Sequence, residues 1–299
     1  MLNFHAPRAD DYAWLYPILS RAKLPGADNT FHNMYFWECY YGEVGLAEGF
    51  ATQHLTQDGA EVYLYPAGTG DVSAALEAIR QDARERGGKL RLRGVTDDKR
   101  DELERLYPGK FTFTPYRDSF DYIYTVEELT ELHGKKLQAK RNHCNRFEAD
   151  HPGFTTEIVT PENIFRCREM VAKWYELHEW NEQIEQEKTA ITRAFDAFEQ
   201  THMDGLMLIE NGEVLAFSMG ARMNEAYYDV CFEKAYSAIN GAYAMINREF
   251  SRMIAEKYPE IAFLNREDDM GEPGLRKAKE SYQPTLLLEK FIAEWQEDA

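Results

Sequence analysis

The spacing of apolar and polar residues in the first half of the chain predicts strands followed by helices. Strict alternation is typical of half-buried strands, whereas apolar side chains three and four residues apart are typical of helices. The predicted strands are 45–55, 60–68, 89–95, 110–115 and 119–126, and the predicted helices are 71–87 and 96–109. We therefore expect the order strand-strand-helix-strand-helix-strand, with segments 110–115 and 119–126 forming a closing strand pair.

The second half of the chain repeats this order. Asn211-Gly212 favours a tight hairpin turn between two alternating stretches, and Pro259 and Pro273 mark where a long helix ends and a later helix begins. The predicted strands lie within 205–224 and at 226–235, 261–265 and 285–295, and the predicted helices are 240–260 and 272–282. Helical segments also precede each half, at 10–22 and then at 161–180 and 188–202. The pattern indicates a duplication at the level of fold.

The length and composition of the chain favour two folded domains. A chain of 299 residues, 44% hydrophobic and 29% charged, is longer than one ordinary core and has the composition of a globular protein. We predict an N-terminal domain over 1–132, a connector helix within 133–152 and a C-terminal domain over 153–299. The expected fold class is α/β (α+β), with a mixed, mostly antiparallel sheet flanked by helices in each domain.

The net charge of -18 disfavours two general classes of binder. A strongly acidic protein repels polyanions at long range, which disfavours general nucleic-acid binding and binding to anionic membranes. The four cysteines form no Cys-x-x-Cys pair and the eight histidines show no ligand spacing, so we expect neither disulfides nor a metal site. Reduced thiols of this kind predict a cytoplasmic protein. We recognise no secretory leader and no apolar run near about 18 residues, so we expect no membrane-spanning segment.

One basic segment stands out against this acidic background. Residues 134–146 contain five cations and no carboxylate, and the helix predicted there begins after Gly134 and ends before Pro152. The candidate phosphate-binding side chains on one flank of this helix are Lys136, Lys140, Arg141, Asn142 and Asn145. The alternative interpretation is a solvated helix face, which charge runs usually form.

A second candidate site lies where strand 261–265 runs into a polar loop and a helix. Open α/β sheets build ligand crevices at the carboxyl ends of their strands. The candidate site residues there are Asn265, Arg266, Asp268, Asp269, Arg276, Lys279 and Tyr282. For the two aspartates the alternative is capping of the following helix, which explains neither Asn265 nor Arg266. For Tyr282 the alternative is packing, and the functional interpretation is a proton donor to a leaving group.

Two motifs carry a resemblance to known proteins. The order of elements resembles a tandem GNAT acyltransferase fold, and the segments GKKLQAKRNHCNRF and FLNREDDMGEPGLRKAKESYQP resemble the bacterial family grouped with the C-terminal domain of phosphatidylglycerol lysyltransferase. The resemblance covers nearly the whole chain. It implies an architecture shared with aminoacyltransferases that use charged tRNA, and it adds Gly271 to the residues that line the site.

These observations lead to three functional hypotheses. The first is transfer of an activated aminoacyl or acyl group, with aminoacyl-tRNA or acyl-CoA as donor, to an amine or hydroxyl acceptor. Asp268 would then be the base, Tyr282 the acid, and Asn265 and Arg266 would orient the acceptor or polarise the carbonyl. The second is an acetyl-CoA-dependent N-acetyltransferase; the GNAT resemblance implies closely spaced glycines where the long helix begins, and here only Gly241 appears. The third is a non-catalytic binding module; donor, acceptor and oligomeric state remain open.

Overall fold

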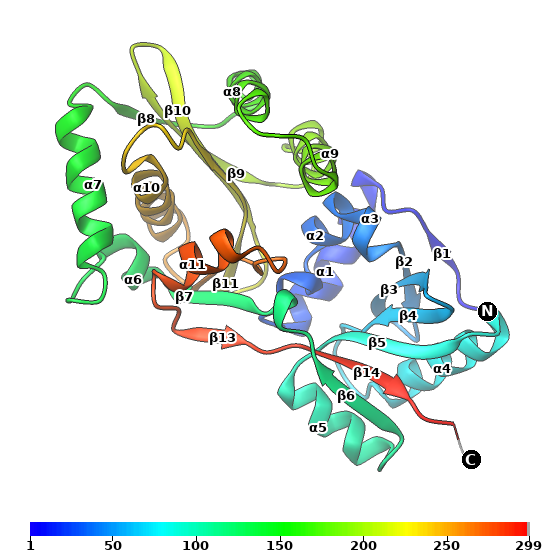
Figure 1. The fold of residues 1–299 in the computed structure, drawn as a ribbon. Helices are drawn as coiled ribbons and strands as arrows, with labels where there is room; N and C mark the ends of the chain where they lie inside the picture. The colour runs from blue at the N-terminus through cyan, green and yellow to red at the C-terminus, as the bar shows by residue number, and fades with distance from the viewer. Residues whose placement is uncertain (298–299) are drawn as a thin grey trace. The chain divides into compact units, whose positions relative to one another are not determined.

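The computed structural model describes residues 1–297 and divides them into two compact units, each built from segments that are far apart in sequence. Unit 1 comprises 1–121, 268–272 and the segment from Leu287 on, and unit 2 comprises 122–267 and 273–286. The predicted boundaries, 1–132, 133–152 and 153–299, divide the chain linearly. Unit 2 contains the predicted connector helix together with residues 122–132, and unit 1 contains 268–272 and the segment from Leu287 on (Figure 1).

The first sheet has seven strands in the order β1-β2-β3-β4-β5-β14-β6 (Figure 1). Its strands are β1 Phe4–His5, β2 Glu43–Ala47, β3 Phe50–Gln57, β4 Ala60–Leu64, β5 Lys89–Val95, β6 Phe111–Pro115 and β14 Phe291–Trp295. The helices of unit 1 are α1 Tyr12–Ala22, α2 Phe31–Phe36, α3 Glu38–Tyr41, α4 Ser73–Arg86 and α5 Asp97–Leu106. All pairs are antiparallel except β4 with β5, which the crossover helix α4 joins.

The second sheet has seven strands in the order β13-β7-β12-β11-β10-β9-β8. Its strands are β7 Asp121–Thr125, β8 Thr155–Ile158, β9 Asp204–Glu210, β10 Glu213–Arg222, β11 Tyr227–Ala235, β12 Phe263–Asn265 and β13 Leu286–Leu288. The helices of unit 2 are α6 Val126–Glu131, α7 Gln138–Asp150, α8 Phe165–Glu176, α9 Glu182–Asp196, α10 Ala242–Lys257 and α11 Pro273–Glu280. Strand β11 pairs in parallel with β12, and α10 joins these two strands.

The two sheets confirm the predicted α/β (α+β) fold class and share one plan. In each, three antiparallel strands lead into a long helix, a parallel strand, a second helix and an edge strand. Each sheet then receives one strand from the other half of the chain. Strand β14 inserts between β5 and β6, and β7 inserts between β12 and β13.

This exchange corrects two predicted pairings. Segments 110–115 and 119–126 do not pair with each other, because β6 pairs with β14 whereas β7 pairs with β12. The single strand predicted at 285–295 is two strands, β13 and β14, which belong to different sheets. The stretch 45–55 is likewise two strands, because Glu48 and Gly49 both adopt positive φ and reverse the chain.

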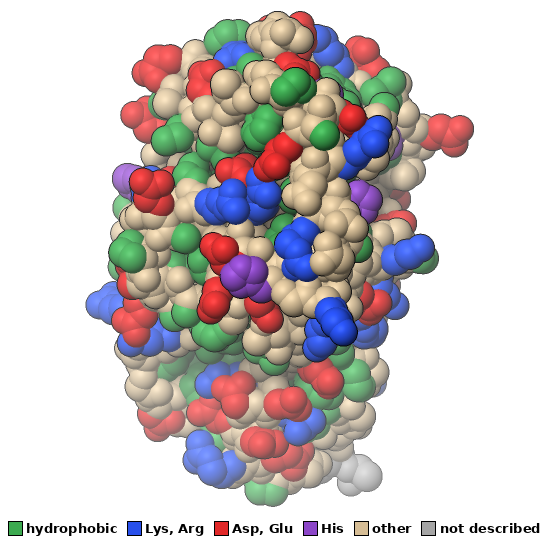
Figure 2. Space-filling view, turned by 90° about the vertical axis from the view of Figure 1, so that its left-hand side faces the viewer, with side chains coloured by type: hydrophobic (Ala, Val, Ile, Leu, Met, Phe, Trp, Pro, Cys, Tyr) green, Lys and Arg blue, Asp and Glu red, His purple; other side chains and the backbone are tan. Residues whose placement is uncertain are grey.

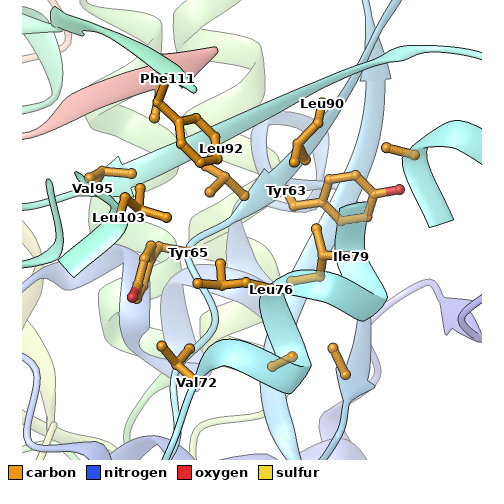
Figure 3. Packing of buried hydrophobic residues seen from close by; sticks show 14 of the residues in the cluster. Tyr63, Tyr65, Val72, Leu76, Ile79, Leu90, Leu92, Val95, Leu103 and Phe111 are labelled. Atoms are coloured by element: carbon orange, nitrogen blue, oxygen red, sulfur yellow. The ribbon is translucent and has the colours of Figure 1, made fainter. Parts of the chain in front are cut away.

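Both faces of the first sheet are covered by apolar packing. Helices α4 and α5 cover one face, where Tyr63 and Leu92 are fully buried, and α1 and α2 cover the other face, where Leu64 is fully buried. Figure 3 shows the larger cluster, which includes Tyr63, Tyr65, Val72, Leu76, Ile79, Leu90, Leu92, Val95, Leu103 and Phe111. Burial of β4 on both of its faces explains why this strand is largely apolar.

In unit 2, consecutive residues of β11 face opposite sides of the second sheet. Glu233 contacts α10 through Asn247, whereas Lys234 forms an ion pair of 2.7 Å with Glu187 of α9 and lies 3.7 Å from the Trp174 ring centroid of α8. Helix α10 therefore covers one face, and α8 and α9 cover the other. Among the described residues, no helix combines the length and apolar character needed to cross a lipid bilayer.

Candidate functional site

The candidate site begins at the carboxyl end of β12, where the chain turns sharply. Asn265 is fully buried, and its side-chain oxygen accepts a hydrogen bond of 2.7 Å from the backbone N–H of Glu267. Glu267 adopts φ +58°, which is uncommon for a residue other than glycine. Asn265 therefore shapes the turn, and Arg266 leaves the strand at its end. Strand β12 runs parallel to β11, so this is the edge where α/β sheets place ligands.

Arg266 joins a carboxylate and two aromatic rings. Its Nη2 donates to Oε1 of Glu233 at 3.1 Å, and its guanidinium carbon lies 4.7 Å from the ring centroid of Tyr282 and 5.7 Å from that of Tyr124. Its Nη1 is buried and has no hydrogen-bond partner among the described residues. A planar cation held in this way has a donor left for a ligand.

Lys140 of α7 lies against the same tyrosine. Its Nζ is 3.9 Å from the ring centroid of Tyr282. Burial, and then repulsion by Arg266, lower the pKa of Lys140 to about 8. Two cations, Lys140 and Arg266, therefore converge with one carboxylate, Glu233. The excess positive charge, enclosed by protein, suits an anionic or strongly polarised group of a ligand.

Tyr282 is held by the helix that precedes it. Lys279 donates from Nζ to the backbone carbonyl of Arg266 at 2.5 Å, and the hydroxyl of Tyr124 donates to the carbonyl of Lys279 at 2.7 Å. These bonds fasten α11 to the end of β12. Tyr282 is 4% exposed, and burial raises its pKa above the usual value, so the phenol keeps its proton at neutral pH.

Two residues of this cluster were missed by the sequence analysis. Glu233 is the carboxylate partner of Arg266, and Asn247 of α10 donates from Nδ2 to Oε2 of Glu233 at 3.0 Å. The available signals were an acid within the largely apolar strand 226–235 and an amide on the buried side of helix 240–260. Glu233 and Asn247 form no sequence motif, because their side chains come into contact only when α10 packs on β11.

The acidic residues of the loop belong to unit 1. Asp269 is fully buried, forms an ion pair of 3.0 Å with Nη1 of Arg117 and accepts a hydrogen bond of 3.0 Å from the N–H of Gly271. Asp268 is half-buried and accepts a bond of 3.2 Å from the N–H of Met270. Gly271 has φ +77°, and a Cβ there would lie 3.0 Å from the carboxylate of Asp118. These contacts fix the loop.

The other candidates of the basic segment lie outside the cluster. Helix α7 begins at Gln138, so Lys136 lies in the preceding turn, where it is exposed, as are Asn142 and Asn145. Arg141 donates from Nη1 to the backbone carbonyls of Leu132 and Gly134 and so ties down the chain before the helix. Arg276 of α11 is half-buried. On the face shown in Figure 2, basic and acidic side chains are interleaved and form no continuous cationic surface.

Unit 1 contains an arginine at the equivalent place, Arg93, whose two terminal nitrogens are occupied and whose buried Nε has no hydrogen-bond partner among the described residues. Arg93 stands near the end of β5, as Arg266 follows β12, and each is followed by a residue with positive φ, Gly94 and Glu267. The Nη1 and Nη2 atoms of Arg93 donate to the carbonyls of Tyr40 and Tyr41 at 2.6 and 2.9 Å. The two units therefore share this feature, and unit 2 retains the unpaired Nη1.

Two further places bear on cofactors. A Cβ on Gly241 would lie 2.2 Å from the carbonyl oxygen of His143, so α7 packs directly on the start of α10, where a phosphate would bind if the helix amides were accessible. Separately, Asp229, Cys231 and Glu267 each place a ligand-type atom within 4.8 Å of the others. Burial, and then the neighbouring Asp229 and Glu267, raise the pKa of Cys231, which disfavours the thiolate that a metal requires.

Two mixed, mostly antiparallel sheets flanked by helices and built on one plan define a duplicated α/β protein, with a polar cluster at the end of β12 in the second sheet. The chain belongs to the family described as phosphatidylglycerol lysyltransferase, C-terminal, whose model matches residues 20–294. This confirms the predicted resemblance.

Two solved structures are similar to the chain over nearly its whole length. A conserved protein of unknown function from Bacteroides thetaiotaomicron is 34% identical, with a TM-score of 0.92 over 99% of this chain and 100% of that one. The structure of L-PGS from Bacillus licheniformis is 15% identical, with a TM-score of 0.67 over 99% of this chain and 94% of that one, which shows the shared fold.

An uncharacterised protein from Mycoplasmoides gallisepticum (strain R(low / passage 15 / clone 2)) is 22% identical over 182 residues, which cover 59% of this chain. The match spans 56% of that relative, so the chain covers about half of its length.

Proposed function

We propose that this protein transfers an activated aminoacyl or acyl group from an ester donor to an amine or hydroxyl acceptor. The observation that carries the proposal is the unpaired Nη1 of Arg266, held beside Lys140 on the buried ring of Tyr282. Positioned donors that face developing negative charge provide much of the rate acceleration in many acyl transfers. Membership of the lysyltransferase family supports the same class of reaction.

In the proposed reaction, the acceptor nitrogen or oxygen attacks the ester carbonyl carbon and forms a new C–N or C–O bond. The ester C–O bond breaks, the acceptor gives its proton to a base, and the leaving oxygen takes a proton from an acid. Asp268 is the proposed base and Tyr282 the proposed acid. Arg266 would stabilise the carbonyl oxygen, Lys140 would hold an anionic part of the donor, and Asn265 would support the turn that positions Arg266.

The proposed donor is aminoacyl-tRNA, and the test follows a labelled amino acid from charged tRNA into lipid, peptide and small-amine fractions. We expect label in one fraction with the wild-type chain, and transfer about 10²–10³ times slower with Arg266→Ala. Absence of transfer to every fraction would remove the aminoacyl version. A thermal shift with acyl-CoA, about 2.7 kcal/mol at 100 times its Kd, would instead favour the N-acetyltransferase alternative.

The non-catalytic alternative makes a different prediction. A binding module would tolerate Asp268→Asn and Tyr282→Phe, because both variants keep the shape of the site, but would lose its cellular phenotype with Arg266→Ala. A transferase that uses the proposed acid and base would lose activity with all three variants.

The lowered pKa of Lys140 predicts a pH dependence for anion binding. With a folded-state pKa of about 8, Lys140 is mostly charged at pH 7 and mostly neutral at pH 9. We expect the affinity for inorganic sulfate, which does not titrate in this range, to fall by about tenfold between these pH values. The measurement is isothermal titration calorimetry at constant ionic strength.

Lys140→Arg is the matched variant for this experiment, because arginine stays charged throughout the range. Its sulfate affinity should change little between pH 7 and 9. A wild-type affinity that is equally flat would contradict the role assigned to Lys140.

A further inference from the structure

A group of buried polar side chains surrounds Glu233 beneath α10. Ser218 of β10 lies directly opposite Glu233 in the antiparallel register, so the two side chains share a face of the sheet. Asn247 of α10 reaches the same carboxylate through Nδ2. Ser218 is fully buried and Asn247 is 2% exposed. The centre of the second sheet therefore holds a polar cluster where apolar packing would be expected.

Three atoms of this cluster have no hydrogen-bond partner among the described residues. They are Ser218 Oγ, Asn247 Oδ1 and Arg266 Nη1. Buried polar groups in native proteins are nearly always paired, because each unpaired group costs about 1–3 kcal/mol. Three such atoms on residues that border one carboxylate indicate that a further molecule completes the hydrogen bonding.

The chemistry of that molecule follows from what each atom requires. A carboxylate only accepts, so the contact with Glu233 fixes the amide of Asn247 with Nδ2 toward Glu233 and leaves its Oδ1 as an unused acceptor. The hydroxyl of Ser218 and the remaining lone pairs of Glu233 also accept hydrogen bonds. Arg266 Nη1 needs one acceptor. A group with several N–H donors, adjacent to an oxygen, meets all these requirements.

We propose that Glu233, Asn247 and Ser218 form a recognition subsite for a primary ammonium group, and that Arg266 Nη1 binds a carbonyl oxygen of the same ligand. The proposal rests on the proposed function, for which it names the substrate class. The ammonium could belong to the transferred aminoacyl group or to an amine acceptor. Both sources present the same three N–H donors, so the experiment must separate them.

Such a subsite should reject ligands that lack the amine. A site built to bond N–H groups discriminates strongly against an analogue without them, because its own buried atoms then stay unpaired. The probes are a panel of amino-acid amides, each compared with its des-amino counterpart, such as alaninamide with propionamide. We expect at least one amide to bind the wild-type chain about tenfold more tightly than its counterpart in calorimetry. No binding by any amide, or equal binding of every pair, overturns the proposal.

Ser218→Ala separates a ligand contact from a structural role. Removal of an unpaired buried hydroxyl should stabilise the ligand-free protein, with a rise in Tm of about 2–4 °C, yet weaken amide binding. Glu233→Gln and Asn247→Leu should reduce the preference for the amine to less than threefold. Glu256→Gln changes an exposed acid on α10 and should leave binding unchanged. A lower Tm for Ser218→Ala with unchanged binding would overturn the assignment of Ser218.

Transfer assays distinguish the source of the ammonium and separate this proposal from the proposed function. If the donor carries it, N-acetylation of the aminoacyl group should abolish transfer; if the acceptor carries it, amines should be used and matched alcohols should not. If transfer is unaffected by N-acetylation of the donor and is equally fast with amine and alcohol acceptors, the ammonium subsite is overturned but the proposed transferase function stands. Selective amide binding without any transfer supports the subsite and removes the transferase.

Discussion

Replacement of Arg266 by alanine should lower the rate of transfer by about 10²–10³, the loss expected when one donor to a developing oxyanion is removed. The effect should appear mainly in kcat, because the proposed contact with the carbonyl oxygen strengthens in the transition state. The same change leaves Glu233 without its cation in a site where that carboxylate is 13% exposed. Breaking a buried pair from one side costs about 3–5 kcal/mol, so the variant should also be less stable.

The experiment must separate these two effects. Arg266→Lys keeps a charge for Glu233 but loses the planar fork, so it should recover stability more than activity. The matched control is Arg222→Ala, because Arg222 forms a surface ion pair of 2.8 Å with Glu260 that contributes about 0–1 kcal/mol. Rates should be measured at a temperature where urea titration shows each variant fully folded. Normal kcat in folded Arg266→Ala would exclude Arg266 from the chemistry.

Replacement of Lys290 by methionine should destabilise unit 1 by about 3–5 kcal/mol. Lys290 is 2% exposed, and its Nζ contacts Oδ1 of Asp121 at 2.8 Å and also pairs with Asp28. Asp121 in turn accepts a bond of 2.8 Å from the N–H of Ala27. The variant would bury two carboxylates without their shared cation. Urea unfolding at pH 7 measures the loss, with Lys99→Met, at a more exposed ion pair, as the control.

The loss in Lys290→Met should depend on pH. Burial, the largest single effect, would raise the pKa of Asp28, but attraction to Lys290 and the hydrogen bond from it, together with Arg93 and Tyr41, hold that pKa below its usual value. A carboxyl with a lowered folded-state pKa contributes stability above its unfolded pKa, and this contribution disappears as the pH falls through the folded pKa. The difference between wild type and variant should therefore be largest near neutral pH and should shrink below about pH 4. A small difference in unfolding free energy between wild type and variant at pH 7 would show that the ion-paired group of Lys290, Asp28 and Asp121 contributes little to stability.

Much of the fold could be predicted because its signals are local. Helices α4 and α10 have sustained apolar spacing, and the hairpin of β9 and β10 has Asn211-Gly212 at its turn. The break between β13 and β14 could not be predicted from the sequence, because the residues on both sides of it are apolar and the pattern indicates a single strand. The break depends on Lys290, whose partner Asp121 lies 169 residues away in the sequence.

The candidate site likewise contains residues that the sequence could identify and residues that it could not. Lys140, Arg266 and Tyr282 lie in polar segments whose composition marks them, and the structure brings these three together in unit 2. Glu233, Asn247 and Ser218 are isolated polar residues in largely apolar elements, and their significance depends on the packing of α10 against β10 and β11. Arg141 looked equivalent to Lys140 in sequence, but the carbonyls of Leu132 and Gly134 use its donors.

The reciprocal insertion of β7 and β14 makes the two repeats mutually dependent during folding. A fragment that ends before residue 285 would lack β14, so β5 and β6 would lose the strand that joins them. A fragment that starts after residue 125 would lack β7 and expose an unpaired edge on β12, which invites aggregation. We therefore expect that neither repeat completes its sheet when the other is deleted.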